Sequence, residues 1–321
     1  MKAAVVLGAG RAPVYGDFEA PIAQGTDQRI DVSASSLSRV TRGRASGAHY
    51  SSTSRYPFVA GVDGTGRLEN GQRVYFVFPH APFGAMAEQS IVNASNCIAL
   101  PDSLDDVTAA AIAIPGMSSY AALIERARFV EGETVLVNGA TGSSGKLAVQ
   151  LAHHLGARKV IATGRNPQAL DQLKRIGADE VISLTSDAKS LDDALEAQFR
   201  EGVDVVLDYL WGASAQAALI AAAKASPDGQ PVRFVQIGSI GGADIQLPGA
   251  VLRSTAITLM GSGIGSVPMP RLLKSMKAVF DAVVPAGLQI ETRAVPLEAL
   301  GAHWDEADSA VRTVFTVGAS A

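Results

Sequence analysis

The chain has 321 residues, of which 47% are hydrophobic and 18% are charged, and its net charge is −4. This composition suits a soluble enzyme of two domains, and the acidic balance argues against a nucleic-acid or anionic-membrane partner. The single cysteine, Cys97, excludes an internal disulfide and a multi-cysteine zinc cluster. We find no run of about 18 uncharged apolar residues and no secretion signal before Pro13, so we expect a cytoplasmic protein.

The first 117 residues are rich in glycine, serine and short β-type runs. We expect strands at Lys2–Leu7, Gln28–Ala34, Gly71–Phe78 and Ala85–Val92. A short helix or turn at Leu37–Gly47 carries Arg39, Arg42 and Arg44, which are either solvated or attract an anionic substrate or the cofactor phosphates. Two helices follow, Val107–Ile114 and Ser119–Arg126, separated at Pro115, and the second crosses into the next domain.

The stretch from Glu133 to Asn166 carries the strongest pattern in the chain. An apolar strand, Glu133–Asn138, is followed by three glycines spaced three apart, by a helix that Ser143 or Ser144 can cap, and by a second strand, Lys159–Thr163. A helix N-terminus offers N–H groups and the positive end of the dipole, and glycines let the backbone approach phosphates closely. This order predicts a dinucleotide pyrophosphate site rather than a purely structural turn. The residues assigned to it are Thr141, Gly142, Ser143, Ser144 and Gly145.

The end of the second strand predicts which dinucleotide binds. An NAD site usually has an acidic residue there for the ribose hydroxyls. This chain has Gly164, Arg165 and Asn166 instead. A small residue followed by arginine leaves room for a 2′-phosphate and supplies a charge-assisted partner, so we expect NADPH as the cofactor.

Strands and helices alternate after Asn166, as in a Rossmann-type doubly wound parallel sheet, which we place at residues 118–262. The strand ends add further cofactor contacts at Tyr209, Ile237, Gly238, Ser239, Gly261 and Ser262. After a helix at Pro270–Val283, the tail reads as a strand, a helix (Leu297–Val311) and a strand. Residues 1–117 and 263–321 are expected to form a β-rich domain.

Four short motifs occur in the order found in the medium-chain dehydrogenase/reductase superfamily, and the chain resembles that family over almost its whole length. The motifs are Gly61–Gly66, Gly71–Val74, Phe83–Glu88 and Gly116–Tyr120. The resemblance implies that the β-rich domain is GroES-like and catalytic. It also implies that Ser118 contacts the cofactor, because the family has a threonine beside the nicotinamide at that position.

The positions that match the catalytic zinc ligands of the family's alcohol dehydrogenases are Ser38, Val62 and Ile114. Valine and isoleucine cannot bind a metal, so the resemblance is to the zinc-free branch, which includes NADPH:quinone oxidoreductases and enone reductases. The expected reaction is hydride transfer to a quinone or an α,β-unsaturated carbonyl compound. Ser38 and Tyr50 are the catalytic candidates, although each side chain has a simpler structural role open to it.

Other functions remain open. An NADPH-binding redox sensor without turnover, or an alcohol dehydrogenase-like enzyme acting on aldehydes or alcohols, would fit the same pattern. A short-chain dehydrogenase is disfavoured because no tyrosine has a lysine four residues later. The apolar strand Ala256–Met260, near a sheet edge, is predicted to pair with its copy in a homodimer.

Overall fold

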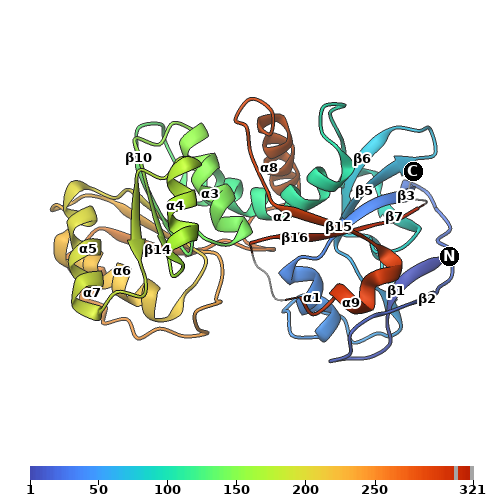
Figure 1. Cartoon of the computed structure of the whole chain (residues 1–321), viewed down its shortest axis with the longest axis horizontal. Helices are drawn as coiled ribbons and strands as arrows, with labels where there is room; N and C mark the ends of the chain where they lie inside the picture. The colour runs from blue at the N-terminus through green and yellow to red at the C-terminus, as the bar shows by residue number, and fades with distance from the viewer. Residues whose placement is uncertain (307–309, 319–321) are drawn as a thin grey trace. The chain divides into compact units, whose positions relative to one another are not determined.

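The computed structural model describes residues 1–306 and 310–318, and it divides by compactness into two units (Figure 1). The first unit is Met1–Ile114 with Ile290–Ala321, and the second is Pro115–Gln289. We placed 263–289 with the β-rich domain, whereas in the structure this segment is part of the second unit. The reason is packing: helix α8 (Met269–Ala282) lies so close to Gly116 that a Cβ there would come within 2.6 Å of Val279.

The second unit is built on a six-stranded parallel sheet in the order β11–β10–β9–β12–β13–β14. Numbered along the unit, this is the order 3-2-1-4-5-6 of a doubly wound dinucleotide-binding sheet, which confirms the predicted fold class. Its strands are β9 (Thr134–Asn138), β10 (Lys159–Gly164), β11 (Glu180–Ser183), β12 (Val205–Asp208), β13 (Val232–Gln236) and β14 (Ile257–Gly261).

Helices cover both faces of this sheet, with α3 and α4 on one side and α5, α6 and α7 on the other (Figure 1). The α5–α7 side encloses an apolar cluster in which Leu136, Phe199 and Phe234 are buried. The helices are α3 (Ser143–His154), α4 (Pro167–Arg175), α5 (Ala188–Glu201), α6 (Gly212–Ala225) and α7 (Gly249–Ser254).

The first unit holds two sheets, one with three strands in the order β2–β1–β4 and one with seven strands. The larger sheet runs β15–β16–β3–β5–β6–β8, with β7 also paired to β3, and among the described residues only the β15–β16 pair is parallel. Short connections and short helices, among them α1 (Arg39–Ser46), complete the predicted β-rich domain. The strands are β1 (Lys2–Val6), β2 (Val14–Asp17), β3 (Asp27–Ser36), β4 (Phe58–Val59), β5 (Asp63–Leu68), β6 (Arg73–Val77), β7 (Gln89–Asn93), β8 (Cys97–Ala99), β15 (Thr292–Pro296) and β16 (Arg312–Thr316).

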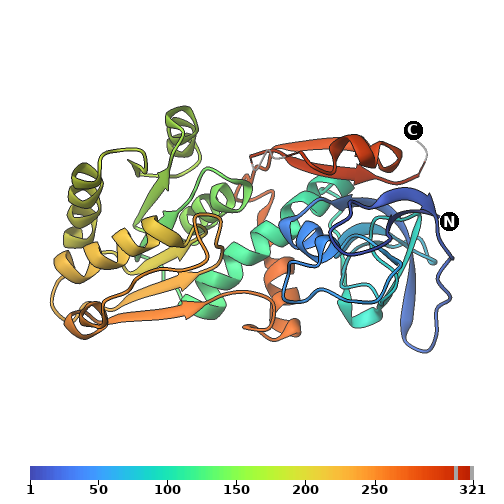
Figure 2. The same cartoon turned by 90° about the horizontal axis from the view of Figure 1, so that it is seen from below.

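The prediction of two separate helices on either side of Pro115 is wrong, because the structure has one continuous helix there. Helix α2 (Asp106–Ala121) runs through Pro115 and continues as a π-helical turn, η2 (Ala122–Ala127), seen as one teal rod in Figure 2. The combined helix also has the length and composition of a candidate membrane span. Residues Asp106–Ala127 satisfy that length and composition, but the most apolar window is 67% buried, as in the core helix of a soluble protein.

The predicted tail helix Leu297–Val311 is too long. The structure has a 3-10 turn, η3 (Leu297–Ala299), and a short helix, α9 (Leu300–His303), and residues 307–309 lie outside the described residues. The helix ends where the carboxylate of Glu306 accepts hydrogen bonds from Arg293 (2.7 Å) and His303 (2.8 Å), which fixes a turn.

Candidate functional site

The glycine-rich loop lies between the carboxyl end of β9 and the first turn of α3. The helix begins at Ser143, and its N-cap is Gly142, with extended backbone (φ −82°, ψ 167°). The predicted capping role of Ser143 or Ser144 is therefore wrong, since both residues lie inside the helix. A cap residue without a side chain leaves a ligand as the natural acceptor for backbone N–H groups of the first turn.

Two of the loop glycines are required by close contacts. Gly139 has a positive φ of 87°, and a Cβ there would lie 2.6 Å from a carbon of Leu210. A Cβ on Gly145 would lie 2.5 Å from the carbonyl oxygen of Gly139 and from the Cα of Ala140. Helix α3 thus packs directly on the loop backbone, as the third glycine of a dinucleotide fingerprint allows.

A buried polar network that the sequence did not indicate holds this loop to the sheet. The hydroxyl of Thr163 donates to Asn138 Oδ1 (2.7 Å) and accepts from the N–H of Gly139 (3.0 Å). Asn138 Nδ2 donates to Asp208 Oδ1 (2.8 Å), which also accepts two backbone N–H groups of the segment that follows β12. Burial raises the pKa of Asp208, and these donors partly offset that effect.

A second buried link joins helix α2 to the loop through Ser119. Its hydroxyl lies 2.7 Å from the hydroxyl of Tyr209, 3.1 Å from the carbonyl of Ser144 and 2.9 Å from that of Pro115. Because the Ser119 proton serves a carbonyl, Tyr209 donates to Ser119. The predicted contact Ser118 is the half-buried neighbour of Ser119, whereas Ser119 itself carried no separate signal in the sequence.

The predicted ribose-phosphate contacts lie at the end of β10. Gly164 is buried, and a Cβ there would come within 2.4 Å of Thr141. Arg165 is exposed, and its guanidinium makes no hydrogen bond or ion pair with the residues that the structure describes. Asn166 is the N-cap of α4, and its Oδ1 accepts a hydrogen bond from the N–H of Ala169 (3.1 Å). Its side chain therefore has a structural role in capping the helix.

The ends of β13 and β14 are positioned by backbone contacts. The N–H groups of Ile237 and Gly238 both donate to the carbonyl of Asp208, at 2.7 and 3.1 Å. Gly238 is needed there because a Cβ would lie 2.5 Å from the carbonyl oxygen of Tyr209. At β14, the N–H of Ser262 donates to the carbonyl of Gln236 (2.8 Å). The other predicted contacts are Ser239, which is exposed, and Gly261, whose carbonyl accepts from Arg126 Nε.

The two catalytic candidates lie in the first unit. Ser38 is buried, and its hydroxyl caps α1 by accepting from the N–H of Thr41 (3.0 Å). Tyr50 is 72% exposed, and its ring lies against that of His49 with centroids 4.1 Å apart. Both side chains thus have structural contacts, and their catalytic role stays a prediction. His80, in the same unit, lies with its Nε2 2.9 Å from Asp27 Oδ1.

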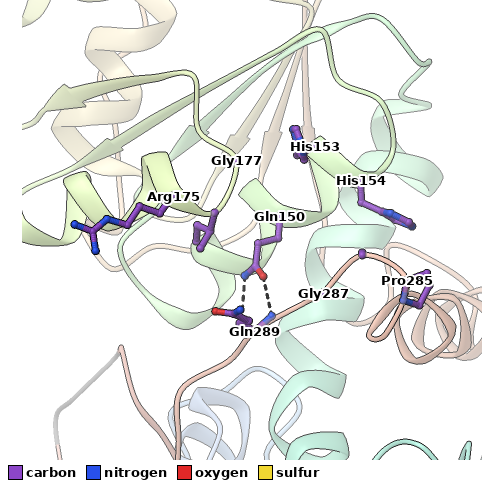
Figure 3. A pocket seen from close by; sticks show the side chains of 10 residues that line it. Gln150, His153, His154, Arg175, Gly177, Pro285, Gly287 and Gln289 are labelled. Atoms are coloured by element: carbon purple, nitrogen blue, oxygen red, sulfur yellow. Dashed lines mark hydrogen bonds between the residues drawn. The ribbon is translucent and has the colours of Figure 1, made fainter.

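A cavity of about 530 Å³ lies at the carboxyl end of α3, lined by His153, His154 and Arg175 (Figure 3). Gln150 closes one side of it by binding the backbone of Gln289 through two hydrogen bonds, of 2.7 and 3.0 Å. A helix of 12 residues is about 18 Å long, so this cavity and the glycine loop lie at opposite ends of α3. The cavity is not the site that the glycines predict.

Within residues 1–306 and 310–318, no group of three His, Cys, Asp or Glu side chains is close enough to hold a metal ion. At the three positions that resemble zinc ligands, Ser38 serves as a helix cap, Val62 is buried on the wall of a small cavity and Ile114 lies in α2.

This chain is similar in sequence to known dehydrogenases and quinone reductases. A family model described as zinc-binding dehydrogenase matches residues 145–281. These lie within the second unit, and Ser38, Val62 and Ile114 lie outside the match. A probable NADPH-dependent quinone reductase of Emericella nidulans is 26% identical, over 92% of this chain and 94% of that protein.

Solved structures show the same fold. A quinone oxidoreductase from Thermus thermophilus, solved alone and with NADPH, superposes with a TM-score of 0.80 at 23% identity and covers 99% of this chain and 100% of its own. An NAD-dependent alcohol dehydrogenase superposes with a TM-score of 0.84 at 21% identity over 99% and 100% of the two chains. The fold is therefore shared by enzymes with different names, whereas the full-length relative is a quinone reductase. The chain therefore resembles the medium-chain dehydrogenase/reductase superfamily and, within it, the branch of the NADPH:quinone oxidoreductases.

Proposed function

We propose that this protein is a zinc-independent NADPH-dependent oxidoreductase that reduces a quinone or an α,β-unsaturated carbonyl compound. The single observation that carries the proposal is Arg165, which is exposed and has no side-chain partner among the described residues. It directly follows the buried Gly164, which ends the strand next to the glycine loop. The relative from Emericella nidulans, named as NADPH-dependent, supports the choice of cofactor.

The residues present fit the cofactor well. The N-terminus of α3, whose cap residue Gly142 has no side chain, suits the pyrophosphate. Gly139 and Gly145 let the loop pack closely against Leu210 and against the helix. Arg165 supplies a charge-assisted partner for the 2′-phosphate. When bound, NADPH supplies the hydride, and the protein contributes orientation and exclusion of water.

Zinc independence rests on the chemistry of the residues that occupy the ligand-like positions. Val62 and Ile114 have no donor atom, and the hydroxyl of Ser38 is engaged with the N–H of Thr41. An electron-poor quinone or enone delocalises the incoming charge, so its reduction needs no Lewis acid. Stoichiometric zinc in the purified protein, by metal analysis, would contradict this part of the proposal.

The cofactor preference is tested by Arg165→Asp. We expect kcat/KM for NADPH to fall about 10- to 100-fold, because the carboxylate repels the 2′-phosphate and a charge-assisted contact is lost. The value for NADH should fall much less. The matched control is Arg200→Asp, an exposed arginine on α5. If Arg165→Asp keeps the wild-type ratio of NADPH to NADH, Arg165 does not select the cofactor.

Turnover itself separates the enzyme from the redox sensor that the sequence leaves open. NADPH oxidation is measured with a simple quinone and with an enone. Consumption of NADPH with either acceptor supports the enzyme, whereas tight NADPH binding without oxidation by quinones, enones or aldehydes favours the sensor.

A further inference from the structure

A small cavity in the first unit combines apolar walls with a single charged side chain. Its volume is about 60 Å³, and its walls include Phe58, Val62, Pro82 and Phe83. Arg44, in the last turn of α1, also lines it. Thr41 and Thr53 add hydroxyl-bearing side chains to its lining. A half-buried cation is costly unless an anion or a hydrogen-bond acceptor meets it.

Arg44 has no such partner within the protein as far as the structure describes it. Two other arginines of this region are engaged, since Arg42 donates to the carbonyl of Glu306 (2.5 Å) and Arg312 to that of Leu37 (3.2 Å). Arg39 is exposed, so water can satisfy its guanidinium. In contrast, the guanidinium of Arg44 makes no hydrogen bond or ion pair with residues 1–306 or 310–318. Burial lowers the pKa of Arg44. The pKa of the neighbouring His49 is also lowered, mainly by burial and to a smaller extent by the positive charge of Arg44.

We propose that this cavity is a carboxylate subsite, in which Arg44 binds an anionic group carried by the hydride acceptor. The substrate class is then an α,β-unsaturated keto acid or a quinone that bears a carboxylate. The inference rests on the proposed function, because it takes the first unit to hold the substrate.

The geometry of the guanidinium favours a carboxylate. The cavity, of about 60 Å³, has room for a small polar group. The planar guanidinium matches a carboxylate through two parallel hydrogen bonds, and the phenylalanine and proline walls suit the flat carbon skeleton attached to it.

A structural role for Arg44 has a different signature. A cation in the last turn of a helix complements the helix dipole, which is worth about 0.3–1 kcal/mol at an exposed site. Such a role would change stability and leave the choice between charged and neutral substrates unaffected. The test therefore uses selectivity as its readout.

The acceptors are 4-oxopent-2-enoate and its methyl ester, which share the enone and differ in charge. The measured quantity is the ratio of their kcat/KM values with NADPH. In Arg44→Met we expect the ratio of kcat/KM for the carboxylate to that for the ester to fall at least tenfold. The fall should be smaller in Arg44→Lys, which keeps the positive charge but cannot form two parallel hydrogen bonds to the carboxylate. The control is Arg11→Met, an exposed arginine of the same unit, whose ratio should stay at the wild-type value. An unchanged ratio in Arg44→Met overturns the subsite.

A second measurement needs neither a variant nor turnover. Phenylglyoxal modifies accessible arginines, and peptide mapping by mass spectrometry gives the rate at Arg44. We expect 4-oxopent-2-enoate to slow that rate at least fivefold and the ester to leave it unchanged. Protection without any NADPH oxidation would sustain the subsite and defeat the proposed enzyme. Reduction of the ester by NADPH, with no protection of Arg44 by the carboxylate, would support the proposed enzyme and overturn the subsite.

Discussion

Three buried polar side chains, Asn138, Thr163 and Asp208, decide how the glycine loop lies against the sheet. Each comes from the carboxyl end of a different strand, and together they bond to one another and to the N–H of Gly139. Buried polar groups are costly when unpaired, so the network is stable only as a whole. It gives the loop a fixed shape before any cofactor arrives, which lowers the ordering cost of binding.

Ser38 shows how one hydroxyl can satisfy a structural need. Its Oγ accepts from the N–H of Thr41 and lies 2.9 Å from the Thr41 hydroxyl. In Ser38→Ala we expect the free energy of unfolding to fall by about 1 kcal/mol, because the N-cap of α1 is lost. Urea unfolding measures this change. A fall in kcat of more than tenfold in the folded variant would instead support the catalytic role predicted from the sequence.

Asp63, on β5, gives the protein a pH-dependent stability. Its carboxyl group is fully buried, and burial raises its pKa from 3.8 to about 7, an effect that Tyr75 and Arg312 partly oppose. Between about pH 4 and about pH 7 the folded state therefore binds a proton that the unfolded state does not. Stability should fall as the pH rises through this window, by up to about 1.4 kcal/mol per pH unit.

The check on Asp63 is urea unfolding across that pH window. Asp63→Asn keeps an acceptor for Tyr75 and cannot ionise, so its stability should lose this pH dependence. If wild type and variant show the same slope, another group is responsible.

At the scale of elements, α2 and α3 are fixed by contacts that override local preferences. Proline lacks an N–H and normally interrupts a helix, yet α2 continues through Pro115 because Gly116 packs on α8 and Ser119 bonds to the Pro115 carbonyl. Helix α3 is held at both ends, by the loop contact of Gly145 and by the bonds from Gln150 to the Gln289 backbone.

The contact between α3 and the segment before β15 can be removed by Gln150→Ala. Gln150 is buried, and the variant leaves the N–H and carbonyl of Gln289 without this partner. We expect a loss of about 1–3 kcal/mol in the free energy of unfolding and faster hydrogen exchange at the Gln289 amide. His154→Ala, an exposed change on the same helix, is the control. Unchanged exchange at Gln289 would show that the segment is held by other contacts.

At the scale of the whole molecule, the outer edge of β14 is the surface on which assembly would act. This strand is the last in the sheet order, and its Leu259 is 38% exposed. Open strand edges invite pairing with another chain. We predict a symmetric homodimer through β14, with Leu259→Lys shifting the protein to monomer in sedimentation velocity at micromolar concentration. A monomeric wild type under those conditions would rule out this dimer.

The sequence by itself determined the alternating strands and helices of the second unit, the glycine loop and the absence of an acid after Gly164. These signals are local: strand hydrophobicity, glycine spacing and residue type at a strand end act within a few residues of the chain. For that reason the fold class was predictable, and so was the location of the loop.

Only the tertiary structure decided which side chains are free to bind a ligand. It engaged Ser38 and Asn166 as helix caps, joined Ser119 to Tyr209 and left Arg44 and Arg165 without a partner among the described residues. It also made α2 one helix and moved the boundary of the second unit to Gln289. Whether a polar group is paired depends on residues far apart in the chain that folding brings together, and no local pattern in a single sequence carries that information.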